Sequence, residues 1–233
     1  APVWEGQKTG WFYDHRLNRR RVQKLAHGKR VLDVFSYTGG WGVQAAVAGA
    51  EAVICVDASA QALDLVDQQA ALNGVSDKVK SLKGDAFTTM RQLHEEGERF
   101  DMVIIDPPAF IARRKDIKAG ELAYQRANQL AMRLLKPEGI LVSASCSMHL
   151  ERTRLTQLLQ ESCRKNGRLG QVLEHGGQGG DHPVPPATSS AARAPRSVSV
   201  SSAIARAPPP PPPPPPAPPP RPSPLRPPSP SSS

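Results

Sequence analysis

The sequence predicts an α/β fold with a doubly wound, mostly parallel sheet, followed by a Pro-rich tail. Short apolar runs alternate with helical patterns over residues 30–165, and repeated strand–helix units build parallel sheets. Acids and glycines follow the ends of these runs, where such sheets bind their ligands. The tail is marked by composition, because residues 183–233 hold 21 of the 25 prolines and neither Asp nor Glu.

Five strands are expected, and each is a short run rich in apolar residues. They cover 30–36, 52–57, 79–85, 100–106 and 140–146. The run at 100–106 is almost continuously apolar, as a parallel strand covered on both faces should be.

Helical patterns fill the intervals between these strands. They cover 43–50, 59–74, 86–97, about 121–135 and about 150–165. Ser59 is the expected N-cap of the second helix, and Asn73-Gly74 its end. We expect a polar basic loop at 111–120 and a turn at Pro137-Glu138-Gly139 before the fifth strand.

Composition divides the chain into a folded domain at 1–182 and a disordered Pro/Ser/Ala-rich tail at 183–233. The tail cannot bury enough apolar surface to offset the entropy of ordering it. The net charge is +9, and the tail carries five arginines, so the preceding part carries +4. This mild excess allows a nucleic-acid partner without requiring one.

The cysteines and the apolar runs indicate in which cellular compartment we expect the protein. The three cysteines, at 55, 146 and 163, show neither zinc spacing nor a disulfide pattern, so we expect reduced thiols and no metal. No apolar run approaches the length of a membrane span. We therefore expect no membrane contact and a cytoplasmic location, and a homodimer is left open.

The stretch "DVFSYTGGWG" (33–42) places a Gly-rich turn after the first strand, where backbone can approach a ligand beside a helix N-terminus. Asp57 ends the second strand, 18 residues after Gly39, and suits the two hydroxyls of a ribose. Asp85 ends the third strand and could accept a bond from an adenine amino group. The turn lacks the G-x-G-x-x-G pyrophosphate pattern, which favours S-adenosylmethionine over NAD.

"DPPAF" (106–110) follows the fourth strand. Its two prolines fix an extended backbone, which places Asp106, prolyl carbonyls and the Phe110 ring beside the cofactor. A flat heterocycle could stack on Phe110 and donate its amino group to this segment. A simple rigid turn is the structural alternative.

Cys146 leaves the fifth strand at the same edge of the sheet, within "SASCSMH" (143–149). A helix N-terminus beyond it, or His149, could favour the thiolate that nucleophilic catalysis needs. Cys55 is expected to be core packing and Cys163 a bystander, and His149 itself could serve only for packing or capping.

Six motifs in order resemble the bacterial ribosomal RNA large subunit methyltransferase I family. They are "GQKTGWFYDHRLNRR" (6–20), "VLDVFSYTGGWGVQAA" (31–46), "VDASAQAL" (56–63), "GDAF" (84–87), "DPPAF" (106–110) and "SCSMH" (145–149), and "GGQGGDHPV" (176–184) continues the match. The resemblance covers about residues 3–184. It implies a Rossmann-like class I methyltransferase that uses S-adenosylmethionine to make 5-methylcytosine in 23S ribosomal RNA.

The resemblance also implies roles for individual residues. Cys146 and Asp106 would be catalytic, Cys146 by adding to C6 of the cytosine and Asp106 by binding its N3/N4 edge. The cofactor would be held by Asp33, Phe35, Tyr37, Thr38, Gly39, Gly40, Asp57, Ala58, Asp85, Ala86 and Asp106. The substrate would meet Gln7, Lys8, Thr9, Asp14, Arg16, Pro107, Pro108, Phe110 and His149. Phosphates could meet Arg19, Arg20, Arg21, Arg113, Arg114 and Lys115, or these could form a solvated basic face.

The sequence departs from the family at both ends. Members carry an N-terminal RNA-binding PUA domain and a hairpin-like linker, so we expect this sequence to be part of a longer chain. After "DHPV" it turns Pro-rich, and we expect the last sheet strand to be lost, by a change of reading frame. N-methylation of an RNA base amine and an inactive cofactor- or RNA-binding remnant remain open, and a tail that binds SH3-like domains is a further alternative.

Overall fold

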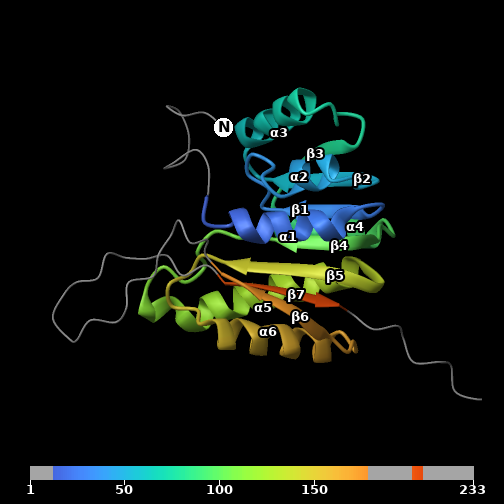
Figure 1. The fold of residues 1–233 in the computed structure, drawn as a ribbon. Coiled ribbons are helices and arrows are strands. Elements are labelled where there is room, and N and C mark those ends of the chain that lie inside the picture. Colours follow the sequence, from blue (N-terminus) through green and yellow to red (C-terminus); the bar gives the residue numbers. More distant parts are fainter. Residues whose placement is uncertain (1–12, 178–200, 207–233) are drawn as a thin grey trace, which may run out of the picture.

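The computed structural model describes residues 13–177 and 201–206, which form a seven-stranded sheet with helices on both faces (Figure 1). The strands are β1 (Arg30–Val34), β2 (Ala52–Asp57), β3 (Val79–Lys83), β4 (Phe100–Ile105), β5 (Leu135–Ser145), β6 (Gln171–Gly176) and β7 (Ser201–Arg206). Their order is β3-β2-β1-β4-β5-β7-β6. The first five run parallel and β7 is antiparallel to both of its neighbours, which confirms the predicted mostly parallel, doubly wound sheet.

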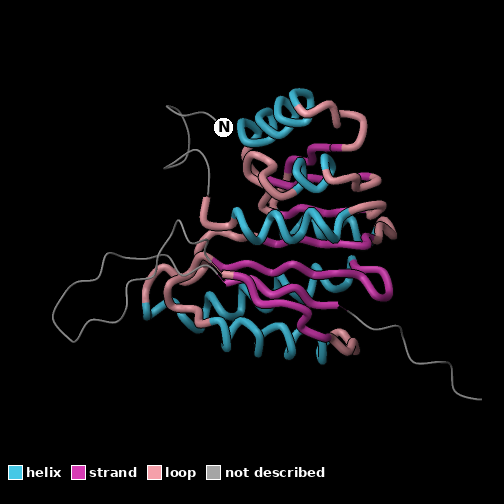
Figure 2. Tube along the Cα trace, viewed as in Figure 1, coloured by secondary structure: helices cyan, strands magenta, loops and turns pink. Residues whose placement is uncertain are grey.

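A helix lies between each pair of consecutive strands from β1 to β6, and Figure 2 shows the helices in cyan around the magenta strands. They are α1 (Arg16–Ala26), α2 (Gly42–Val47), α3 (Ala60–Leu72), α4 (Ala86–Glu95), α5 (Ile117–Leu134) and α6 (Arg152–Lys165), with a short 3-10 turn η1 (Arg114–Asp116). Apolar residues of α1, α2 and α3 pack on one face of the sheet, and those of α4, α5 and α6 pack on the other. As predicted, Ser59 caps α3, its Oγ accepting a hydrogen bond from the Ala62 N–H.

The alternation of side chains along β1 decides what lies in each layer. Val31 belongs to the core under α1–α3, and Leu32 to the core under α4–α5. Successive residues of a strand point to opposite faces, so Asp33 enters the α1–α3 layer. The chain leaves β1 toward β2 on one side and returns beside it as β4. In doubly wound sheets ligands bind at the carboxyl ends of the strands where the order reverses in this way.

The helix before β5 starts earlier than the sequence predicted. We expected a loop over 111–120 and a helix from 121, but α5 begins at Ile117 and η1 precedes it. Gly120 explains the difference, because a Cβ there would lie 2.7 Å from the Phe110 carbonyl oxygen. The glycine is therefore a contact point between α5 and the loop after β4, and it does not mark a break in the helix.

Two other boundaries were also wrong. β5 begins at Leu135, and the predicted turn at 137–139 forms an irregularity inside it, where Phe100 pairs with Leu135 but Met102 pairs with Ile140. Pro137 has no N–H to donate, and Glu138 takes a positive φ of 62°. The helix after β5 begins at Arg152, not at Leu150, because the Leu150 N–H closes a turn onto the Ser147 carbonyl and Glu151 has an extended backbone.

The expectation that the last sheet strand is lost is wrong, because β7 is present. Its backbone pairs with β5 from Ile140 to Ser145 and also with β6, so the sheet position beside β5 is occupied. This strand belongs to the stretch expected to be a disordered tail, and the rest of that stretch lies outside the described residues. Within the described residues no helix is both long enough and apolar enough to span a membrane.

Candidate functional site

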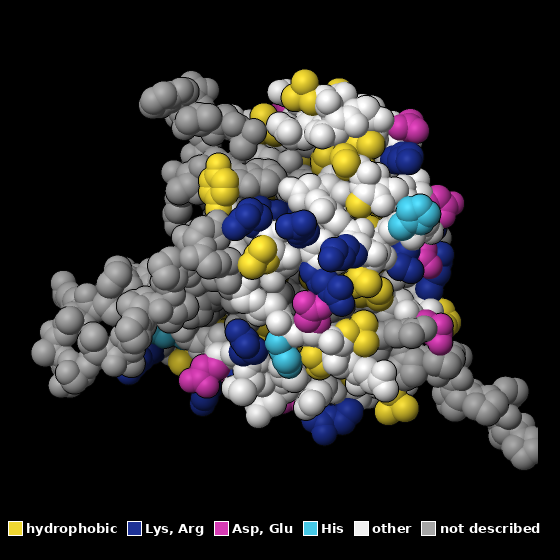
Figure 3. Space-filling model, viewed as in Figure 1, with side chains coloured by type: hydrophobic (Ala, Val, Ile, Leu, Met, Phe, Trp, Pro, Cys, Tyr) yellow, Lys and Arg dark blue, Asp and Glu magenta, His cyan; other side chains and the backbone are white. Residues whose placement is uncertain are grey.

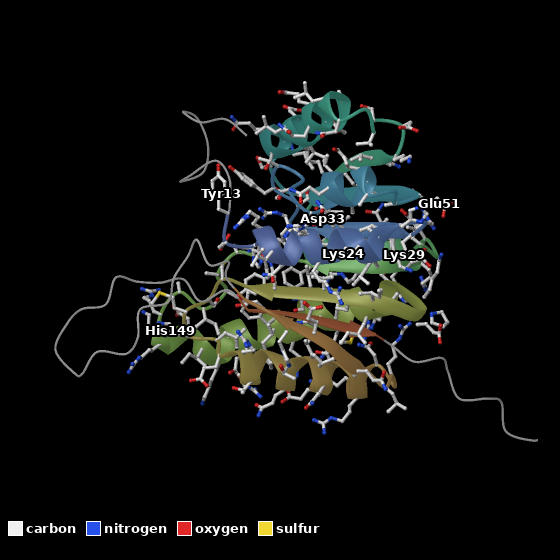
Figure 4. The ribbon with its side chains drawn as sticks, in the orientation of Figure 1. Tyr13, Lys24, Lys29, Asp33, Glu51 and His149 are labelled. Carbon is white, nitrogen blue, oxygen red and sulfur yellow. The ribbon has the colours of Figure 1, made fainter. Side chains whose placement is uncertain are left out.

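The turn after β1 is held from below by a buried acid. Asp33 is fully buried, and its Oδ2 accepts a hydrogen bond from the Gly42 N–H at 2.8 Å. A Cβ on Gly42 would lie 2.6 Å from the Cys55 Sγ, so only glycine lets the start of α2 approach the strands this closely. Burial raises the pKa of Asp33 to about 8, and the charges of Asp106 and Asp57 add to the rise. Asp33 thus lies beneath the turn (Figure 4) and has no exposed surface.

The turn itself has a strained backbone. Phe35 and Tyr37 take positive φ values of 63° and 49°, which side chains other than glycine rarely adopt. Gly39 has a φ of 78°, and a Cβ there would meet Val43 and Val66. These residues leave the backbone of 35–40 close to the carboxyl ends of β1 and β2, where a ligand could contact it.

Two further acids follow the neighbouring strands: Asp57 ends β2, as predicted, whereas β3 ends at Lys83 and Asp85 lies two residues beyond it. Asp57 Oδ2 accepts from the Tyr37 N–H at 2.9 Å and its Oδ1 accepts from the Ser59 N–H at 2.9 Å. Asp85 is exposed and caps α4, because its Oδ1 accepts from the Thr88 N–H, and this bond lowers its pKa. Each carboxylate oxygen has a second lone pair, so both acids keep acceptor capacity for hydroxyl or amino groups of a nucleoside.

Three aromatic rings from separate segments meet at this edge. The Phe110 ring lies 6.1 Å from both Phe35 and Phe87, centroid to centroid, and the Phe35 and Phe87 rings are 6.3 Å apart. The loop after β4 therefore reaches the turn after β1 and the start of α4. A half-buried aromatic surface of this kind suits a planar base.

Asp106 is the charged centre of the site. Its Oδ2 accepts from the Trp41 Nε1–H at 2.8 Å, and its Oδ1 lies 3.4 Å from the His15 Nε2. Burial alone would raise the pKa of Asp106, but His15, Trp41 and Arg19 together lower it below its usual value. Burial likewise opposes protonation of His15, yet Asp106 and Asp14 raise its pKa. The two shifts describe one ion pair, with Asp106 held as a carboxylate.

Buried residues of helix α1 reach the site, although the sequence did not predict this role for them. The Asn18 amide contacts the His15 Nδ1 at 3.1 Å and donates to the Gly177 carbonyl at 3.1 Å. Arg19, expected to meet phosphates, is 5% exposed, and burial lowers its pKa although the nearby acids raise it. That expectation is wrong, because the side chain is directed into the acidic centre and away from solvent.

The other residues predicted to contact the substrate near α1 differ in where they lie. Asp14 and Arg16 lie at the amino-terminal end of α1, next to His15. Gln7, Lys8 and Thr9 lie outside the described residues. Arg21 pairs with Glu174, and Arg113 with Asp116, so both are engaged within the chain.

Cys146 is the first residue after β5, and it lies beside the loop of Asp106. Its Sγ–H donates to the Pro107 carbonyl oxygen at 3.7 Å, and the side chain is partly exposed. Cys55 is fully buried in the core, as predicted, and Cys163 is partly exposed and contacts the Met132 sulfur. His149 is half-buried and follows Cys146 by three residues, in the loop before α6 (Figure 4). The helix N-terminus invoked for Cys146 is more distant than expected, since α6 begins six residues later.

Sequence reasoning missed four residues that hold this site together. Trp41 lies within the motif "TGGWG", and its ring N–H could have identified it as a hydrogen-bond donor to an acid. His15 lies within the motif "DHR" and was not assigned a role. Tyr124 and Ser147 form buried hydroxyl contacts, and the predicted helical pattern of about 121–135 gave no sign that one residue would reach back to the end of β5.

The arrangement fits a nucleoside cofactor next to a base. A strained glycine turn and two acids with spare acceptor capacity line one part, and a carboxylate, an aromatic ring and a thiol line the other. Among the described residues no group of three or more His, Cys, Asp or Glu could hold a metal ion.

Comparison with known proteins agrees with this geometry. A family model described as S-adenosylmethionine-dependent methyltransferase matches residues 3–187. The chain belongs to this family. S-adenosylmethionine is therefore the cofactor, in agreement with the turn that lacks a pyrophosphate pattern.

Curated relatives confirm the resemblance noted in the sequence. Ribosomal RNA large subunit methyltransferase I of Aeromonas salmonicida is 39% identical over 183 residues, which are 78% of this chain and 46% of the relative. The protein of the same name from Tolumonas auensis is 39% identical over 180 residues, 77% of this chain and 45% of the relative. The chain thus spans about half the length of these relatives.

Solved structures confirm the fold. A methyltransferase known as SMU.776, crystallised with SAH, has a TM-score of 0.74 at 22% identity and covers 87% of this chain and 51% of its own. A SAM-dependent methyltransferase from Agrobacterium tumefaciens has a TM-score of 0.63 at 21% identity, covering 86% and 64%. At these identities the likeness concerns the fold alone.

Proposed function

We propose that this protein transfers a methyl group from S-adenosylmethionine to C5 of a cytosine in 23S ribosomal RNA, with Cys146 as the nucleophile. The contact between the Cys146 thiol and the Pro107 carbonyl carries the proposal, because it joins the end of β5 to the segment that begins with Asp106. The names of the relatives supply the substrate class. An RNA substrate of this kind also favours the cytoplasm.

The cofactor would lie over the turn after β1. The backbone of 35–40 would face it, the Asp57 carboxylate would accept from its ribose hydroxyls, and Asp85 with Ala86 would face its adenine. The residues expected from the sequence to hold it, Ala58 and Asp106 among them, stay part of the proposal, and Asp33 changes its role. Asp33 would act through Gly42, since it has no surface of its own. When bound, the cofactor supplies an electrophilic methyl group on a sulfonium.

The chemistry requires a thiolate because C5 of cytosine is a poor nucleophile. The Cys146 sulfur would form a bond to C6, and the electron pair displaced from the C5–C6 double bond would make C5 able to accept the methyl group. A base would then remove the C5 proton, the C5–C6 double bond would re-form, and the S–C6 bond would break. Cys146 thus leaves as the thiolate that began the sequence.

Asp106 would bind the polar edge of the cytosine. Its lowered pKa keeps it a carboxylate, which can accept a bond from the cytosine N4 amino group. Trp41 and His15 orient both of its oxygens, which pre-organises the acceptor before the base arrives. Pro107, Pro108 and Phe110 would form the surface against which the base rests.

The exposed side of α1 is the surface that we propose for the RNA backbone. Arg16, Arg20 and Lys24 are exposed and lie four residues apart, which places them on one side of a helix that contains no acid. Figure 3 shows Lys and Arg side chains gathered over this face. The row begins beside Asp14 and His15 at the site, so phosphates next to the target base would meet it first.

A charge reversal tests this surface. We expect Arg20→Glu with Lys24→Glu to weaken RNA binding and to lower the slope of log K against log salt by about one to two, since each single-strand phosphate contact contributes roughly 0.7. Lys80→Glu with Lys83→Glu on β3 makes the same change in charge on exposed residues elsewhere. Equal losses in both double variants would remove α1 from the binding surface.

The catalytic proposal is tested by methyl incorporation into 23S ribosomal RNA with labelled S-adenosylmethionine. Cys146→Ala should abolish incorporation while cofactor affinity stays within about twofold of the wild type, and Cys163→Ala should retain it. Full incorporation by Cys146→Ala would instead support N-methylation of a base amine, for which the D-P-P segment and Phe110 are also suited. Cofactor binding without any turnover by the wild-type chain would support the inactive-remnant alternative.

A further inference from the structure

Three buried hydroxyl groups form a network on either side of Cys146. The Ser145 hydroxyl donates to the Tyr124 hydroxyl at 2.8 Å, and the Tyr124 and Ser147 hydroxyls are 2.8 Å apart. The Ser147 N–H donates to the Ser145 Oγ at 3.1 Å. All three side chains are at most 1% exposed, so these bonds are shielded from water.

The same network reaches the loop that carries Asp106. The Ile111 N–H donates to the Ser147 Oγ at 3.1 Å, and the Tyr124 ring packs edge-on against Phe110, with centroids 4.9 Å apart. One side chain on α5 therefore fixes both neighbours of Cys146 and the far end of the D-P-P-A-F segment. The thiol lies between them, against the Pro107 carbonyl.

Stability alone does not require such a network here. Buried polar groups contribute little net stability once their desolvation is counted, and apolar residues of the same size serve as well in a core. A fully connected network instead holds its members in one arrangement. What it holds in this case is the thiol relative to the loop of the acid.

The ionisation of Tyr124 agrees with such a role. Burial raises the pKa of the phenol, the bonds to Ser145 and Ser147 lower it, and the charge of a Cys146 thiolate raises it again. The net shift is upward, so the hydroxyl keeps its proton and remains a donor.

We propose that the Tyr124 hydroxyl, acting through Ser145 and Ser147, is a positioning group that aligns the Cys146 thiol with the Asp106–Phe110 segment. The inference rests on the proposed function, since it presumes that Cys146 attacks the base. It adds that the reactive geometry is set from α5, by a residue that touches neither the cofactor nor the base.

Tyr124→Phe removes the hydroxyl and keeps the ring against Phe110. Single-turnover methyl transfer should fall about 10- to 100-fold, as a displacement of the nucleophile by about 1 Å would cause. KM for RNA and the affinity for S-adenosylmethionine should stay within about twofold. Ser147→Ala, which likewise removes one hydroxyl group, should show the same split between kcat and KM. Combined with Tyr124→Phe, it should add little, because both act on the same thiol.

Covalent trapping measures the rate at which Cys146 bonds to the base, which a purely structural role of Tyr124 would leave unchanged. On RNA that carries 5-fluorocytidine the fluorine cannot leave as the C5 proton does, so the S–C6 bond persists and the adduct can be counted on a gel. The adduct should form more slowly in Tyr124→Phe by the same factor as methyl transfer.

Ser143→Ala is the matched control, because Ser143 is fully buried on β5 and its Oγ has no hydrogen-bond partner in the described structure. Trapping rates in Tyr124→Phe and Ser147→Ala that equal the control rate would overturn the positioning role. A Cys146→Ala variant that still methylates would refute the proposed function itself, so the two failures are distinguishable.

Discussion

The buried acid under the glycine turn gives a prediction about stability. Asp33 has a pKa of about 8 in the folded protein against 3.8 for the group in water. The folded state therefore binds this proton more tightly than the unfolded chain does. The favourable contribution is fully present below pH 3.8, and it is lost as the pH rises toward 8. At about 1.36 kcal/mol per pH unit, the wild type should lose up to about 4 kcal/mol from this group between pH 5 and pH 8.

Asp33→Asn removes the titration and keeps an acceptor for the Gly42 N–H. The amide N–H₂ would take the place of Oδ1, which has no hydrogen-bond partner, at a cost of about 1–3 kcal/mol. This cost is the same at every pH. We therefore expect the stability of the variant relative to wild type to rise by up to about 4 kcal/mol from pH 5 to pH 8.

Urea unfolding followed by circular dichroism at several pH values measures this difference. Asp101→Asn is the control with the opposite sign: burial opposes its ionisation, but the Arg30 N–H and Lys136 lower its pKa. Its contribution is present above pH 3.8 and is lost as the pH falls through the lower folded pKa. A stability difference between Asp33→Asn and wild type that stays constant from pH 5 to pH 8 would refute the reasoning.

Three further predictions concern the same edge of the sheet. Gly42→Ala should destabilise the fold by about 1–3 kcal/mol in thermal unfolding, because its Cβ would overlap the Cys55 Sγ, whereas Gly97→Ala, with open space around it but a positive φ of 81°, should cost backbone strain alone. Asp57→Asn should weaken S-adenosylmethionine binding about tenfold or more by calorimetry, since a carboxylate accepts ribose hydroxyls and backbone N–H groups more strongly than an amide; an unchanged affinity would contradict this. His15→Gln should cost stability below pH 6.5 and progressively less as the pH rises through the raised pKa of His15, and equal losses at pH 6 and pH 9 would contradict the ion pair with Asp106.

The sequence predicted most of the fold because its signals are local and repeated. Apolar runs gave all five parallel strands, and the acids at their ends followed from the rule that such sheets bind ligands there. The boundaries failed where a tertiary contact decided them. Gly120 was taken as a loop residue, although it lies inside α5 and admits the Phe110 carbonyl. β7 could not be anticipated from composition, because its pairing with β5 joins residues about sixty positions apart.

The site was predicted in its parts and not in its connections. Asp106, Cys146 and the glycine turn stand out as residue types at strand ends. The groups that join them do not, because a buried His15 or Tyr124 looks in the sequence like any other core or helix residue. Arg19 shows the converse error, since a basic run was taken as one exposed face although a helix turns one of every three or four of its residues inward.

The glycine turn links two acids that are held in opposite protonation states. The Gly42 N–H donates to Asp33, whose pKa is raised, and the adjacent Trp41 donates to Asp106, whose pKa is lowered. In the proposed complex, a cofactor on the backbone of 35–40 would lie beside Trp41, the group that orients Asp106. We therefore expect changes at Trp41 to alter base recognition and cofactor affinity together, whereas changes at Tyr124 should alter neither.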